Sequence, residues 1–157
     1  MLHAGPQALR RIISRMRDGF SFIASSAWMY PALEVVHLLG VALLVGSLVV
    51  LELRVWGAGR ALELAALARL ALPVSLAGFG LVVMAGLGLF SAHPGEMLAN
   101  RAFLIKMGLV MAAGLNAAAF HARGGLQKAD RVARAQTLLS LGLWIAVIIC
   151  GRWIAYV

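Results

Sequence analysis

Hydrophobic residues form four long stretches that polar residues interrupt only rarely. These stretches cover residues 33–54, 70–92, 101–121 and 135–156. Each offers about the 20 apolar residues that a helix needs to cross the hydrocarbon of a bilayer. Breaks rich in glycine, proline or tryptophan separate them, at residues 56–59, 93–95 and 124–125. The pattern predicts an all-α integral membrane four-helix bundle over residues 31–157.

A different pattern occupies residues 1–30. At helical spacing, apolar side chains from Leu9 to Ala27 fall on one stripe, and arginine, serine and aspartate side chains cover the rest of the surface. Trp28 and Tyr30 follow, and such aromatic side chains favour the membrane interface. We expect an amphipathic helix that lies among the lipid headgroups, with its arginines against phosphates. A soluble arm packed on a partner protein is the alternative.

Composition supports a membrane environment. Hydrophobic residues make up 62% of the 157 residues and charged residues only 13%, whereas soluble domains carry about 25% charged residues. The formal net charge is +8, which by itself would be compatible with nucleic-acid binding. In a membrane protein, arginine and lysine collect at helix ends beside anionic lipid. We therefore expect the lipid bilayer, and no nucleic acid, as the partner of this charge.

The distribution of basic residues suggests an orientation. Two loops on one face carry Arg54, Arg60, Arg69, Arg123, Lys128, Arg131 and Arg134, and the opposite connection carries Arg101. Basic loops remain in the cytoplasm, so both termini are expected outside it. Arginines near the N-terminus favour the reverse orientation. We give the loops more weight, because an interfacial helix can hold arginine on either leaflet.

Small residues mark one face of the second span. Ala71, Gly78, Ala85 and Ala92 recur every seven residues, with Gly88 beside them. In lipid, small residues let helix backbones approach closely. The seam predicts close helix packing, and the admission of a flat cofactor between helices is left open.

The polar residues at membrane depth suggest a ligand site, because ionisable groups there are costly and usually face a cavity or one another. Glu34 and His37 share one helical face. A hairpin of the first two spans can bring them toward His93 and Glu96. Two imidazoles and two carboxylates can hold a transition metal, and imidazoles also bind haem iron. His121 is a candidate ligand for a second site, and the alternative for each histidine is a hydrogen bond to backbone or side chain.

Cationic residues accompany this candidate site. Lys106 lies one turn inside the third span, on the side of the membrane where His37 enters, and Arg101 opens the same span. Together they would attract an anion such as a haem propionate or a quinol headgroup. The alternative for Lys106 is snorkelling to the surface. Glu52 and Arg54, at the end of the first span, are expected in the cytoplasmic interface, paired with loop charges.

Several residue strings suggest a family. Residues 30–40 (YPALEVVHLLG), 100–106 (NRAFLIK) and 114–116 (GLN) resemble a functionally uncharacterised bacterial family of four-span inner-membrane proteins. His37, Gly40, Gly46 and Lys106 are also similar to positions in CopD-type copper-resistance membrane domains. His37, Lys106 and His121 are similar to positions in HemJ-type protoporphyrinogen oxidases, and this likeness implies a b-type haem or porphyrin site. The resemblance to the four-span family also implies the bacterial inner membrane.

Three hypotheses follow. The leading one is a protein that binds haem b through His37, with His93, His121, Arg101 and Lys106 as further candidates, and passes electrons. It would act alone or as the anchor of a redox complex, with complex subunits, a quinone or a second copy of the chain as partners. The second is copper binding or transport through His37, Glu34 and His93, with Met97 as a further ligand. The third is a structural or assembly subunit. Phosphate loops, CxxC, HExxH and nucleophile-elbow motifs are missing from the sequence.

Overall fold

The computed structural model describes residues 26–156. This part of the chain is built from helices: α2 (Met29–Trp56), α3 (Leu64–Ala92), α4 (Pro94–Ala99), α5 (Arg101–Ala122), α6 (Gly125–Lys128) and α7 (Arg131–Trp153). The predicted all-α class with four long apolar helices is confirmed. The amphipathic helix predicted over residues 1–30 lies almost wholly outside the described residues.

The four long helices α2, α3, α5 and α7 are each long and apolar enough to cross a membrane. The chain is therefore a multi-pass membrane protein in contact with lipid. Helix α3 begins at Leu64, six residues before the predicted span, and continues through Pro73. Helix α7 ends at Trp153, three residues before the end of its predicted span. The differences arise because hydropathy locates the hydrocarbon layer, whereas a helix can continue into the interface wherever its backbone hydrogen bonds are satisfied.

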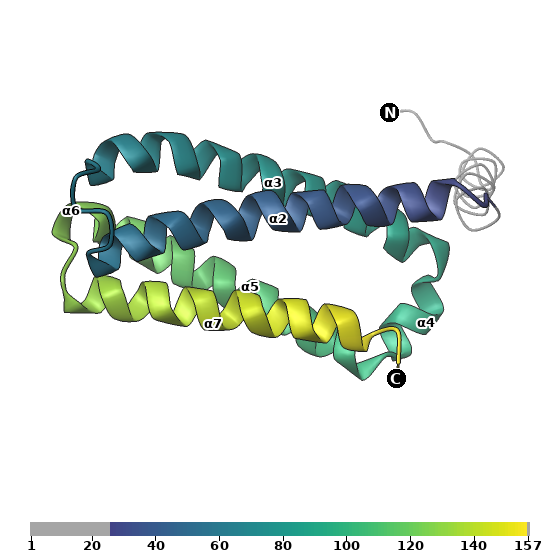
Figure 1. The fold of residues 1–157 in the computed structure, drawn as a ribbon. Coiled ribbons are helices and arrows are strands. Elements are labelled where there is room, and N and C mark those ends of the chain that lie inside the picture. Colours follow the sequence, from purple (N-terminus) through teal and green to yellow (C-terminus); the bar gives the residue numbers. More distant parts are fainter. Residues whose placement is uncertain (1–25, 157) are drawn as a thin grey trace, which may run out of the picture.

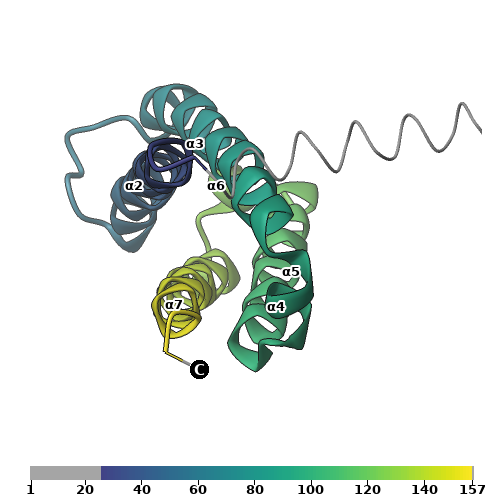
Figure 2. The ribbon, with the colours of Figure 1, turned by 90° about the vertical axis from the view of Figure 1, so that its right-hand side faces the viewer.

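The long helices form two antiparallel hairpins, α2 with α3 and α5 with α7, and α2 also contacts α7. Figure 1 shows the hairpins side by side, with the start of α2 and the end of α7 at the same end of the bundle. Figure 2 looks along the bundle and shows α7 below α2, with α5 beside α7. The short helix α4 joins the hairpins at one end, which we call the α4 end. Helix α6 lies at the other, the α6 end.

The α2–α3 hairpin is held by close backbone contact. A Cβ atom placed on Gly78 would lie 2.6 Å from the Leu44 backbone nitrogen and 2.8 Å from the Gly40 carbonyl oxygen. Ala71, Gly78 and Ala85 of the predicted seam are buried on this side of α3. The prediction that small residues mediate helix packing is thus confirmed for the first hairpin.

At the α6 end, side chains from all four long helices meet. Val55 of α2, Phe120 of α5 and Ala133 of α7 form one buried cluster, and Leu64 of α3 packs against it. A neighbouring cluster contains Leu51, Ala68 and Ala71. These contacts join the two hairpins where their loops lie.

The loop before α7 is organised by Asp130. Its carboxylate accepts a hydrogen bond from the Ala133 backbone nitrogen at 2.8 Å and so caps the helix. It also forms an ion pair with Arg123, at 2.8 Å between Oδ2 and Nη2. The Arg123 hydrogen bond and the backbone hydrogen bond from Ala133 both lower the pKa of Asp130 below its usual value.

The glycine contact gives a first prediction. Gly78→Ala is expected to lower the free energy of unfolding by about 1–3 kcal/mol, because the new methyl group meets backbone atoms that cannot rotate away. Gly80→Ala is the matched control, since its Cβ meets nothing within 4 Å. The control should be neutral or stabilising by about 0.5–1 kcal/mol. Unfolding of both variants in mixed micelles measures the difference, and equal stabilities would contradict close packing at Gly78.

The Asp130 contacts give a second prediction. A carboxylate whose pKa is lowered by folding stabilises the protein above its unfolded-state pKa, and this stabilisation is lost as the pH falls through the folded-state pKa. The thermal unfolding temperature should therefore drop as the pH falls below about 4, the usual pKa of an aspartate. Asp130→Asn keeps a capping side chain but cannot titrate, so this contribution should be missing from its pH profile. Identical profiles for the two proteins would disprove the assignment.

Candidate functional site

His37 lies in the α2–α3 hairpin, two turns into α2. Its ring is half-buried, and its Nδ1 atom is 3.1 Å from the carbonyl oxygen of Val82 on α3. Gly86, one turn further along α3, provides room for the ring, because a Cβ there would lie 3.4 Å from the His37 Cε1 atom. The imidazole is thus fixed between the two helices by one hydrogen bond and one small residue.

The other predicted metal ligands are not gathered around His37. Glu34 and His93 are exposed, and the His93 ring packs edge-on against Tyr30, with centroids 6.4 Å apart. His93 follows Gly86 by seven residues, which corresponds to about 10 Å along a helix. Across residues 26–156, no three His, Cys, Asp or Glu side chains are close enough together to hold a metal ion. The metal site that the sequence spacing of Glu34, His37, His93 and Glu96 allowed is therefore not formed in the structure.

His121 lies at the opposite end of the bundle. It occupies the last turn of α5, is exposed, and packs against the Phe120 ring at a centroid distance of 5.5 Å. Helix α5 runs from the α4 end to the α6 end (Figure 1). His37 and His121 therefore lie near opposite membrane surfaces and cannot bind the same small ligand.

Lys106 is a predicted cation whose charge acts on His37. It is half-buried, and its ammonium group interacts electrostatically with the His37 imidazole and with Cys150. A Cβ placed on Gly151 would lie 3.6 Å from its Nζ atom. The lysine side chain therefore lies against α7 while its charge acts on α2.

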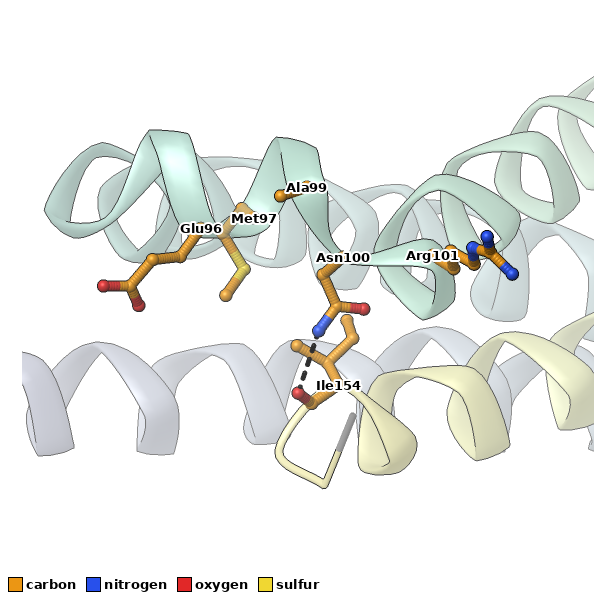
Figure 3. A pocket seen from close by; sticks show the side chains of 6 residues that line it. All are labelled: Glu96, Met97, Ala99, Asn100, Arg101 and Ile154. Carbon is orange, nitrogen blue, oxygen red and sulfur yellow. Dashed lines mark hydrogen bonds between the residues drawn. The ribbon is translucent and has the colours of Figure 1, made fainter.

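Arg101 is exposed at the α4 end, where it lines a surface cavity of about 420 Å³. The other lining residues are Glu96, Met97, Ala99, Asn100 and Ile154. In Figure 3, the Arg101 guanidinium and the Glu96 carboxylate point away from each other, and the Asn100 side chain lies between α4 and the end of α7. Asn100 donates a hydrogen bond to the Ile154 carbonyl at 3.1 Å and caps α5 by accepting one from the Phe103 nitrogen. This cavity thus lies at a helix junction.

The structure contains a polar layer that sequence reasoning missed. Glu52 was expected in the interface, paired with loop charges, and this prediction is wrong: only 4% of the residue is exposed. Its carboxyl group hydrogen-bonds the Ser140 hydroxyl of α7, and its Oε2 atom has no hydrogen-bond partner. Arg54, the cation expected nearby, instead donates to the Leu62 carbonyl at 2.6 Å.

Hydrogen bonds between helices surround Glu52. Trp56 Nε1 donates to the Thr137 hydroxyl at 2.8 Å, and the Asn116 amide donates to the Gln136 carbonyl at 2.9 Å. We call Glu52, Trp56, Asn116, Gln136, Thr137 and Ser140 the polar layer. A sequence signal existed, since Gln136 and Ser140 lie four residues apart on one face of an apolar helix. Their meeting with Glu52 depends on how α7 packs against α2.

The Trp56–Thr137 hydrogen bond gives a third prediction. Thr137→Val should lower the free energy of unfolding by about 1–3 kcal/mol, because the indole N–H loses its acceptor inside the bundle. Thr137→Ser retains the hydroxyl and is the matched control. Denaturant titration in micelles compares them, and a valine variant as stable as the serine variant would argue against this bond as a tie between α2 and α7.

Comparison of the chain with family models, with curated proteins and with solved structures gives no match. The similarity to CopD-type and HemJ-type proteins therefore remains an expectation from residues such as His37 and Lys106. Functional inference rests on the geometry of the chain itself, which establishes a multi-pass membrane protein with a fixed intramembrane histidine and a buried polar layer.

Proposed function

We propose that this membrane protein binds b-type haem through His37 and transfers electrons, alone or as the anchor subunit of a redox complex. The observation that supports the proposal is the contact between His37 Nδ1 and the Val82 carbonyl at 3.1 Å. A carbonyl oxygen can only accept, so Nδ1 carries the proton, and in the neutral ring Nε2 keeps its lone pair. Histidines that ligate metals are typically oriented in this way by a carbonyl or carboxylate on the other nitrogen.

Lys106 adds a second element to the proposal. Its ammonium group, half-buried between α5 and α7, acts on the His37 ring. A haem bound at His37 would carry propionate anions, and a nearby cation in a low-dielectric environment favours such a charge. Arg101 lies five residues earlier on α5, at the membrane surface, where it can pair with an anion only at the periphery.

His37, whose ring is held against the Val82 carbonyl, is the residue of this chain that would hold a haem. His93 packs against Tyr30 beyond the end of α3, and His121 packs against Phe120 at the opposite end of the bundle. Neither histidine lies beside His37. Haem would supply one-electron redox chemistry. His37 would hold the iron, and the carbonyl of Val82 would keep the imidazole in the ligating tautomer. Copper bound by His37 with Glu34, His93 or Met97 is the competing proposal. It requires side chains that the structure holds apart to move together.

The proposed location is the bacterial inner membrane with both termini in the periplasm. Helix α2 begins and α7 ends at the same end of the bundle (Figure 1). The loops at the α6 end carry most of the basic residues of the described chain. By the positive-inside rule, that end faces the cytoplasm.

The test is an optical spectrum of purified protein produced with abundant haem. A Soret band is expected for the wild type and for His121→Ala, whose exposed side chain lies at the far end of the bundle. His37→Ala should lose the band, because iron loses its ligand. Elemental analysis of the same samples checks for copper.

The outcomes separate the hypotheses. A colourless wild type that carries copper, lost in His37→Ala, would establish the copper proposal instead. A colourless, metal-free protein whose His37→Ala variant still folds, as judged by circular dichroism and gel filtration, would show that His37 serves helix packing alone.

A further inference from the structure

The Glu52 carboxyl group is not explained by the haem proposal. It follows His37 by 15 residues on α2, which places it about 22 Å away along the helix. It lies near the α6 end, in a cavity of about 50 Å³ between α2, α3, α5 and α7. The Glu52 Oε2 atom is buried and has no hydrogen-bond partner.

Two arginines near the α6 end bind groups other than Glu52. Arg123 pairs with Asp130 and donates to the Gln136 side chain at 3.2 Å, and Arg54 binds the Leu62 carbonyl. Glu52 forms no ion pair within the described part of the chain. The Thr137 hydroxyl is also occupied, since it accepts from Trp56 and donates to the Arg134 carbonyl. Ser140 is the hydrogen-bonding neighbour of the carboxyl.

An isolated carboxylate is very unfavourable in a low-dielectric interior, so it is neutralised by a proton or by a bound cation. One carboxylate balances one positive charge. A divalent ion bound to one carboxylate would leave one positive charge uncompensated. Glu52 is the one carboxylate among the residues that line the cavity, so no other side chain there can balance that charge. A proton satisfies the charge balance without requiring further ligands, and the acid form can donate to a hydroxyl such as that of Ser140.

The cavity provides access to water. His121, which is exposed, lines it together with Glu52. A volume of about 50 Å³ is enough for water, since one molecule requires roughly 10–15 Å³. Polar groups of Asn116, Gln136 and Ser140 also line it. A buried acid and an exposed imidazole thus line one cavity that is large enough to hold water.

We propose that Glu52 is a reversible proton-binding site that exchanges protons with the aqueous phase at the α6 end through this cavity and His121. In the transfer, the His121 imidazolium or a water-borne hydronium gives its proton to the carboxylate. An N–H or O–H bond breaks there, an O–H bond forms on Glu52, and the reverse step returns the proton. Among the other cavity-lining residues, His121 of α5 is the one titratable group. Helix α3 contributes Leu72, and α7 contributes Gln136, Thr137 and Ser140, which are uncharged.

Infrared spectroscopy of the full chain in lipid nanodiscs tests the site. At neutral pH the wild type should show the carbonyl-stretch band of a protonated carboxylic acid, and Glu52→Gln should lose it. Glu96→Gln, at an exposed carboxyl on α4, is the matched control and should keep the band. His121→Ala should slow the response of the band to a pH jump. No acid band in the wild type, or the same band in Glu52→Gln, would overturn the proposal.

A second measurement uses wild-type protein alone, in case Glu52→Gln does not fold. Dicyclohexylcarbodiimide modifies protonated carboxyl groups in apolar surroundings, and mass spectrometry locates the modified residue. Modification of Glu52 at neutral pH, declining at alkaline pH and unaffected by Na⁺, is expected. Unmodified Glu52 would contradict the proposal, and protection by Na⁺ would show a metal-cation site instead. Both experiments work on colourless protein, so their outcome is independent of haem binding at His37.

Discussion

Hydrocarbon offers polar groups neither hydrogen-bond partners nor charge screening, and this constraint shapes the whole molecule. Four long helices satisfy their own backbone groups. The polar side chains at depth must then find partners on neighbouring helices, as His37 does at Val82 and Trp56 does at Thr137. Because apolar surface gains little from association in lipid, these bonds and close backbone packing hold the helices together.

Different contacts hold the helices together in different parts of the bundle. Along its middle, the α2–α3 hairpin relies on small residues, and the contact at Gly40 and Gly78 brings the two backbones together. Toward the α6 end, the polar layer and the buried clusters connect both hairpins. His37 belongs to the first hairpin, whereas Glu52 faces the region where both hairpins meet. Ligand binding at one and proton exchange at the other are therefore separable properties.

Sequence reasoning succeeded where a signal is local. The small-residue seam of α3 follows from helical periodicity, and the burial of Ala71, Gly78 and Ala85 agrees with it. It failed for Glu52, because a glutamate near a helix end beside an arginine resembles an ordinary interfacial pair. The spacing that allowed Glu34, His37 and His93 to meet was also insufficient, since the ring of His93 lies against Tyr30 beyond the end of α3.

Length and hydropathy alone were enough to establish a multi-pass helical membrane protein, because crossing a bilayer depends on the composition of each segment and not on its neighbours. The pairing of polar groups is a property of helix crossings. Glu52 and Ser140 are separated by more than half of the chain, and only the packing of α7 against α2 makes one the partner of the other. The tertiary structure therefore decided which charged residue is buried, and with it where the chain can hold a proton.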